Sequence, residues 1–270
     1  MKFSLRFAVV LAVVASFIYA CKPDPVDPEP TPVTPTPTPT PGVPTGNAIG
    51  ISFENFVGND SLILDQVIRY VNANGDSFSV ETYKYYISNI SFTDNLGNTW
   101  YENESYHLID AEDTNSLMVY IDSIPAGTYT SINFMIGVDS ARNCSGSQTG
   151  ALDPVNGMFW TWNSGYIFAK IEGRSPSSPQ SFNFMIYHIA GYGAPNAAQR
   201  WVSPTFGSAT AVVTANTVPI MHMKNDLSEW FKTPNIIDVA AISVMNTAGH
   251  DAMNFADNYM DMFTITGIDN

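Results

Sequence analysis

The sequence is poor in cysteine and in positive charge. It has 2 cysteines among 270 residues, and 11 Lys and Arg residues against 25 Asp and Glu residues. Proteins that bind nucleic acids or anionic lipid surfaces use clusters of Lys and Arg, which this acidic chain lacks. We therefore expect no nucleic-acid partner. The acidic composition is compatible with cations and neutral molecules as ligands.

Motifs of the common enzyme classes are also missing. The chain contains no GxSxG serine elbow, phosphate-binding P-loop, HExxH or CxxC sequence. Carboxylate pairs such as Asp153 with Glu172 could flank a glycosidic bond. A chain with 25 acidic residues produces such pairs by chance, however. We expect no catalytic activity.

The N-terminus reads as an export signal. Residues 1–20, MKFSLRFAVVLAVVASFIYA, join a basic start to an apolar run that is too short to cross a bilayer. Cys21 follows in the sequence IYAC, which resembles a bacterial lipobox, in which the cysteine is lipidated. We expect signal peptide cleavage and a lipid anchor on Cys21. Cys144 is then the one remaining thiol, so no intramolecular disulfide can form.

Residues 21–46 contain ten of the 18 prolines of the chain. Proline at nearly every second position prevents helix and sheet and favours an extended polyproline II stalk. Acidic residues soon after the cysteine (Asp24, Asp27 and Glu29) resemble the surface-export signal of Bacteroidota lipoproteins. We therefore expect an outer-membrane lipoprotein, at the cell surface or the periplasmic face, whose folded domain spans residues 47–270.

From residue 47 onward, short runs of alternating apolar and polar residues are separated by Gly, Pro, Asn or Asp, which predicts strands. We expect them near 48–57, 66–71, 82–93, 105–109, 116–124, 127–137, 165–172, 181–190, 208–215 and 236–244. The DNLG sequence after the third run predicts a hairpin turn. Helical spacing is confined to 225–232 and 251–262. The pattern predicts an all-β antiparallel sandwich with one or two short helices near the C-terminus.

The stretch GALDPVNGMFWTWNSGYIF, residues 150–168, is unusually aromatic for an acidic chain. If it is extended, Trp160 and Trp162 face the same side and Phe159 faces the other. Large aromatic side chains of this kind commonly close one end of a hydrophobic core. Lining of a ligand pocket by one of the two indoles is the alternative.

Short polar side chains precede the aromatic stretch in a glycine-rich loop. Asp139 and Asp153 could pin this loop through hydrogen bonds to backbone N–H groups, or could bind calcium through their oxygens. Loop pinning is the simpler interpretation. Calcium is retained as the alternative.

Three segments together resemble the MbnP-like family. They are GVDSARNCSGSQTGALDPVNGMFWTWNSGYIFAKIEG (137–173), FMIYHIAGYG (184–193) and GHDAMNFADNYMDMF (249–263). The family comprises exported copper-binding proteins, including the partner protein of methanobactin operons and surface copper proteins of methanotrophs. The resemblance implies a copper ion bound by two histidines, and a tryptophan two residues before the first histidine that a dihaem cytochrome c peroxidase-like partner oxidises to kynurenine.

By this resemblance the copper ligands are His188 and His250. Two residues before His188 stands Ile186 in place of the tryptophan, so no kynurenine can form there. Neutral imidazole is the commonest protein ligand for copper, and thioethers suit the reduced state of copper. The thioether of Met253 could line the copper pocket. The alternatives are a strand histidine bonded to backbone for His188 and a helix-capping histidine for His250.

Two functions from different classes remain. The first is a lipoprotein that binds copper through His188 and His250, in copper acquisition or handling. The second is a surface-tethered glycan-binding module that stacks exposed aromatic side chains on sugar rings and holds no metal. The family resemblance and the two histidines favour the first.

Overall fold

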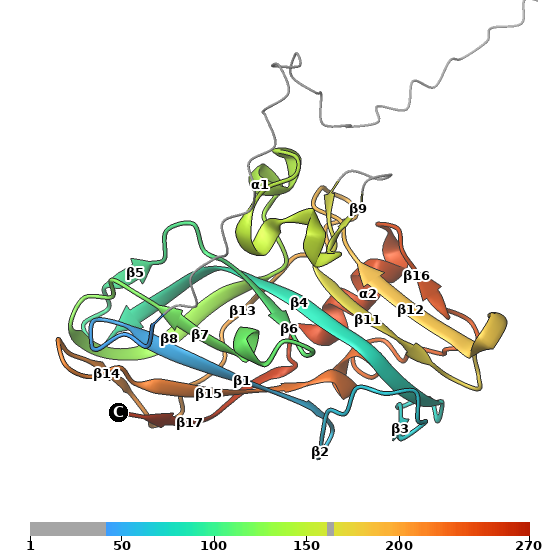
Figure 1. Cartoon of the computed structure of the whole chain (residues 1–270), viewed down its shortest axis with the longest axis horizontal. Coiled ribbons are helices and arrows are strands. Elements are labelled where there is room, and N and C mark those ends of the chain that lie inside the picture. Colours follow the sequence, from blue (N-terminus) through green and yellow to red (C-terminus); the bar gives the residue numbers. More distant parts are fainter. Residues whose placement is uncertain (1–41, 161–164) are drawn as a thin grey trace, which may run out of the picture. The chain divides into compact units, whose positions relative to one another are not determined.

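The computed structural model describes residues 42–160 and 165–270 (Figure 1). The expected signal peptide, Cys21, most of the expected stalk and Trp162 lie outside the described residues. The described chain is built mainly of strands, which confirms the all-β prediction. No helix within the described residues is long and apolar enough to cross a membrane.

The larger of the two main sheets is organised around one strand, β4 (Ser77–Asp94). Its remaining strands are β3 (Tyr70–Val71), β5 (Thr99–Tyr101), β6 (Tyr106–Asp110), β8 (Gly127–Ile136), β11 (Ala169–Arg174), β12 (Phe184–Ile189), β13 (Arg200–Val202), β14 (Ala211–Val213) and β16 (Val244–Met245). Lys84 pairs with both β11 and β6, and Ile87 pairs with both β8 and β6. Thus β11 and β8 follow one another along the same edge of β4.

The smaller sheet has β1 (Ile49–Val57) near its centre, beside β15 (Ile220–Asp226) and then β17 (Phe263–Asp269). The other edge of β1 carries β7 (Met118–Ile121) and β2 (Asp60–Ser61). Alternation along β1 turns its apolar side chains inward. Two pairings, β1 with β15 and β12 with β16, are parallel, whereas the sequence had predicted an antiparallel sandwich.

Aromatic side chains fill the space between the two sheets. Tyr85 of β4 meets Phe53 of β1 with ring centroids 6.3 Å apart, and Phe134 of β8 meets Phe263 of β17 at 5.2 Å. All four side chains are buried. Rings of this size provide much of the apolar area that a sandwich core needs.

Two short helical elements cover the inner face of β12. They are the 3-10 turn η5 (Leu227–Phe231) and helix α2 (His250–Tyr259). Tyr187 of β12 stacks on Phe255 of α2 at 4.6 Å, and Trp230 packs on Tyr259 at 5.1 Å. The expected helix at 225–232 starts later, since β15 extends to Asp226, whose side chain accepts the Ser228 N–H.

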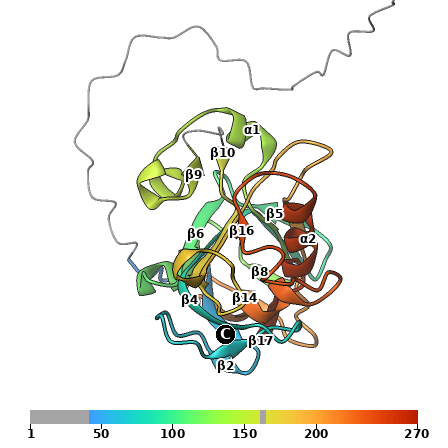
Figure 2. The ribbon, with the colours of Figure 1, turned by 90° about the vertical axis from the view of Figure 1, so that its right-hand side faces the viewer.

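Further short elements connect the strands. They are η1 (Thr114–Leu117), α1 (Ser140–Cys144), η2 (Gly150–Leu152), η3 (Pro154–Asn156), β9 (Phe159–Trp160), β10 (Gly165–Tyr166) and η4 (Ser181–Asn183). In both views α1 and β9 lie near each other at the top of the domain, and Figure 2 shows β10 beside them (Figures 1 and 2). Of the expected strand 236–244, only Val244 is in a strand, because Asp238 accepts the Ala240 N–H and starts a turn.

Candidate functional site

The segment that carries the aromatic motif leaves and rejoins the large sheet at one point. Gly137 N donates to Tyr86 O at 3.0 Å, and Tyr86 N donates to Phe168 O at 2.9 Å, so both ends of the segment meet the middle of β4. Gly137 has φ +112°, and a Cβ there would lie 2.8 Å from the Phe168 ring. The motif segment therefore sits at the junction between β8 and β11.

The aromatic side chains described in this segment belong to the core. Trp160 is 5% exposed, and the rings of Phe159 and Tyr166 meet at 5.0 Å. The Tyr166 hydroxyl, also buried, donates to Leu152 O at 2.9 Å. Trp160 thus offers no exposed face for stacking on a sugar, and Trp162, its expected companion, lies outside the described residues.

Asp139 and Asp153 both bind the backbone of their own loops. Asp139 caps α1 by accepting the Arg142 N–H at 3.1 Å and also accepts the Tyr106 hydroxyl. Asp153 caps η3 by accepting the Val155 N–H at 2.9 Å. These bonds are those that the loop-pinning interpretation requires.

His188 lies on the outer face of β12 with a carboxylate beside it. Its Nε2 is 2.7 Å from Glu172 Oε1 on β11, and its side chain is 18% exposed. The pairing of Lys170 with His188 and of Glu172 with Ile186 puts all four side chains on one face of the sheet. Lys170 Nζ lies 3.2 Å from the same Glu172 oxygen.

This surrounding keeps Glu172 ionised. The hydrogen bond with His188, opposed by burial and reinforced by Lys170, lowers the pKa of Glu172 to about 2. An ionised Glu172 accepts a hydrogen bond from the Nε2–H group of His188, and this leaves Nδ1 as the nitrogen with a lone pair. The pair therefore holds the imidazole in a tautomer suited to binding a metal through Nδ1.

His250 is the first residue of α2 and is largely exposed, at 81% of its side chain. Asn254 Nδ2 lies 3.2 Å from His250 Nδ1, and Asp251 Oδ1 lies 3.7 Å from the same nitrogen. Met253 follows on α2 and is half-buried. The expected helix cap is absent, since no side chain caps the N-terminus of α2 at Gly249.

The segments that contain His188 and His250 meet at one end of the large sheet. The two imidazole rings, however, contact different side chains. Gly191, three residues after His188, packs closely against Ala248, two residues before His250. Tyr187 faces α2, so the next side chain, His188, leaves β12 on the opposite face. Within 42–160 and 165–270, no three or more His, Cys, Asp or Glu side chains form a metal-binding group.

The two other histidines are hydrogen-bonded to carboxylates elsewhere in the domain. His107 Nε2 is 3.0 Å from both carboxylate oxygens of Glu102. His222 Nε2 is 2.9 Å from Asp269 Oδ2, and this hydrogen bond raises the pKa of His222. In β15 the flanking methionines, Met221 and Met223, are buried while His222 faces outward, as the alternation of side chains along a strand requires. Neither histidine is near a second imidazole in these contacts.

Comparison with protein families identifies the chain. A sequence model of the MbnP family matches residues 46–254. The chain belongs to the MbnP family. This membership confirms the resemblance drawn from the motif and associates the chain with copper handling at the level of the family.

A solved structure agrees in fold. The MbnP from Methylosinus trichosporium is similar to this chain with a TM-score of 0.50 and 14% sequence identity, over 75% of this chain and 82% of that one. No curated protein matches the sequence significantly. At this identity the likeness supports the MbnP fold and does not extend to the ligands of this chain.

Sequence reasoning missed Glu172 as the partner of His188. The sequence pointed to Glu172 only as half of a carboxylate pair with Asp153. The signal lies in the hairpin of β11 and β12, whose register puts positions 172 and 188 on one face. That register depends on where the connection turns, at Phe182 and Asn183, both with positive φ, and no glycine marks this turn.

Proposed function

We propose that this MbnP protein binds copper outside the cytoplasm through His188 and His250, for acquisition or handling of the metal and without catalytic turnover. The observation that carries the proposal is the half-buried His188, whose Nε2 faces the ionised Glu172 in a member of a copper-associated family. When bound, copper would supply Lewis acidity and redox activity, and the protein would supply imidazole ligands.

The donor chemistry fits copper, although the two rings have separate partners in this structure. His188 has a carboxylate that orients it, which is the usual arrangement behind a metal-binding histidine. His250 is exposed, and the amide of Asn254 beside it is able to turn its oxygen toward Nδ1. In this proposal His188 is the principal ligand. Its side chain leaves β12 on the face away from α2, so His250 becomes the second ligand only when the start of α2 moves toward that face.

Kynurenine takes no part at position 186, since Ile186 cannot be oxidised to it. The proposed site therefore does not depend on a dihaem partner enzyme acting at that position. The half-buried Met253 lies three residues after His250 on α2 and carries a soft thioether sulfur.

The proposed location is the outer membrane, at the cell surface or the periplasmic face, through a lipid on Cys21. It is supported by the lipobox-like IYAC and the acidic residues after it. The proline-rich stalk would then hold the domain away from the bilayer. Mass spectrometry of protein extracted from membranes, showing an acylated N-terminal Cys21 peptide, tests this part.

Metal analysis of the mature chain tests copper binding. We expect wild-type protein purified from copper-supplemented cells to retain copper after dialysis. We expect His188→Ala to lose at least tenfold in copper affinity, and the double variant His188→Ala/His250→Ala to retain none. His222→Ala is the matched control, because His222 is an ion-paired histidine of the other sheet, and it should bind like wild type.

Equal copper content in wild type and the double variant would contradict the proposal. A loss that is the same in His222→Ala would indicate nonspecific binding to surface imidazoles. The glycan-binding alternative gains no support from the described motif residues, because Trp160 is buried.

A further inference from the structure

One part of the outer face of the large sheet is uncharged, and it spans the neighbouring strands β5, β4, β8 and β13. On the core side of these strands, Phe92, Ile132 and Phe134 are buried. Because side chains alternate along a strand, the residues next to them in sequence leave on the outer face. These outer residues form two rows, Thr99–Thr93–Ser131–Thr205 and Tyr101–Ser91–Asn133–Ser203, with Met135 and Trp201 beyond the second row.

Two exposed aromatic side chains lie at opposite edges of this uncharged face. Tyr101 on β5 is 70% exposed, and Trp201 on β13 is 51% exposed. Strands β4 and β8 lie between them, and since neighbouring strands are about 4.8 Å apart, the strands that carry the two rings are about 14 Å apart. A ligand that contacts both rings therefore has to be long enough to cross the sheet.

The residues between the two rings offer hydroxyl and amide groups. The hydroxyls of Thr93 and Thr99 share a hydrogen bond at 2.9 Å. Ser203 Oγ donates to Asn133 Oδ1 at 2.8 Å, so Nδ2 is the group of this half-buried amide that can donate to a ligand. The side chain of Ser131 is exposed between these two pairs. Donors and acceptors that alternate in this way suit a ligand that is itself rich in hydroxyl groups.

None of the residues in the two rows carries a charge, although the chain has 25 acidic residues. The charged residues that adjoin them in sequence have other partners. Asp94 accepts a hydrogen bond within its own hairpin turn, and Glu102 lies 3.0 Å from His107 Nε2. Arg200 forms an ion pair with Asp257 of α2. A charged ligand would therefore meet no opposite charge in the two rows, and a protein partner would need a larger apolar centre than Ser, Thr and Asn provide.

We propose that this uncharged face binds a neutral oligosaccharide or polysaccharide chain. Tyr101 and Trp201 stack on sugar rings, because the electron-rich face of an aromatic ring attracts the C–H groups of a sugar. Between them, the Asn133 amide and the neighbouring hydroxyls bind the hydroxyl groups of the sugar. The site does not involve the tryptophans of the motif, and it needs no copper.

The proposed sugar site is separate from the copper site. Figure 1 shows β5 and β8 to the left of α1, whereas β11 and β12, which carry Glu172 and His188, lie to its right. Loss of sugar binding and loss of copper binding can therefore be measured independently. Failure of one proposal leaves the other standing.

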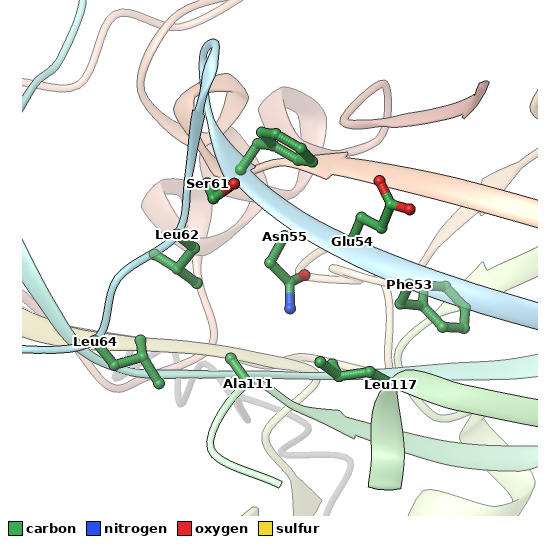
Figure 3. A pocket seen from close by; sticks show the side chains of 9 residues that line it. Phe53, Glu54, Asn55, Ser61, Leu62, Leu64, Ala111 and Leu117 are labelled. Atoms are coloured by element: carbon green, nitrogen blue, oxygen red, sulfur yellow. The ribbon is translucent and has the colours of Figure 1, made fainter. Parts of the chain in front are cut away.

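The hollow at the free edge of β1 provides a control surface (Figure 3). Its volume is about 340 Å³, and its aliphatic lining consists of Leu62, Leu64, Ala111 and Leu117. Glu54 also lines it, with a carboxylate oxygen 3.6 Å from His222 Nδ1. A sugar in this hollow would meet aliphatic side chains and a carboxylate, in place of the hydroxyl rows. We therefore expect Leu62→Ala to leave sugar binding unchanged.

Affinity electrophoresis of the mature chain in gels that contain xyloglucan, galactomannan or mixed-linkage β-glucan tests the site. We expect at least one of these neutral polymers to retard the wild-type protein, and polygalacturonate, an anionic polymer, not to retard it. Trp201→Ala and Tyr101→Ala should each bind the retarding polymer at least tenfold more weakly. Phe182→Ala, which removes a ring that is 77% exposed elsewhere on the domain, should bind like wild type.

Tryptophan fluorescence gives a second readout that a purely structural role would not change. The polymer should protect Trp201 of the wild type from quenching by acrylamide, and Trp201→Phe should lose this protection while it keeps part of the affinity. Because both rings are exposed, the alanine variants should keep the Tm of the wild type. The proposal is overturned if no neutral polymer binds, or if both alanine variants bind like wild type. It is also overturned if the two variants convert a dimer to a monomer with sugar affinity unchanged, which would mean that a second copy of the chain covers this face.

Discussion

Glu172 and His188 face each other across β11 and β12, and a single proton joins them. The low pKa of Glu172 means that the carboxylate stays charged through the whole physiological range. Its contribution to folding is present above the unfolded value of about 4.3 and is lost as pH falls toward about 2. One pair therefore serves both acid stability and the orientation of the imidazole.

We expect Glu172→Gln to lower copper affinity by about 10- to 100-fold, because the amide no longer fixes the tautomer of His188. Below pH 4 the variant should also lose less stability than wild type, since the titrating group is gone. Competition with a copper chelator measures the first effect, and urea unfolding between pH 2 and pH 7 the second. If the copper affinity is unchanged and only the loss of unfolding free energy at low pH is reduced, Glu172 has a structural role only.

At the scale of elements, Gly137 is where the motif segment leaves β8. Its φ of +112° and the closeness of the Phe168 ring leave no room for a side chain. We expect Gly137→Ala to destabilise the domain by about 1–3 kcal/mol, measured by urea unfolding. Gly127→Ala, at the other end of β8 and with ordinary backbone and space around it, should change stability by less than about 0.5 kcal/mol.

Elements set by local chemistry were predictable, and those set by distant contacts were not. The DNLG turn is where the sequence indicated, with Gly97 N donating to Asp94 O at 3.1 Å. The strands β15 and β17 were taken as parts of helices or left out, although both contain alternating residues. β15 pairs with β1, about 170 residues away along the chain, and β17 pairs in turn with β15, so no local pattern encodes either assignment.

Dependence on distant contacts also limits how much of the candidate site is predictable from the sequence. His188 and His250 were found through a motif, and the buried Trp160 through its aromatic surroundings. The partner of each histidine depends on strand register and on how α2 packs, which are properties of the assembled domain.

At the scale of the whole domain, Phe255 connects three parts. Its ring contacts Tyr187 of β12 at 4.6 Å and Trp230 of η5 at 6.2 Å, and it is fully buried in α2. We expect Phe255→Ala to cost about 3–5 kcal/mol, as large core truncations do. Phe182→Ala, which removes an aromatic ring that is 77% exposed, should cost less than about 0.5 kcal/mol.

Differential scanning calorimetry of the two phenylalanine variants checks this expectation. A single lowered transition in Phe255→Ala would show that α2 unfolds together with the sheets. Two separate transitions would contradict the view that α2 is part of one core.

Because β8 and β11 share one edge of β4, that strand belongs to both halves of the large sheet. A fragment that keeps either half needs β4 to complete its backbone hydrogen bonds, and only one fragment can have it. The large sheet consequently cannot be divided into two fragments that each fold independently. New sequence is accommodated more readily in the connections, and the span between Gly137 and Phe168, which starts and ends at neighbouring points, is where length can change at least cost to the scaffold.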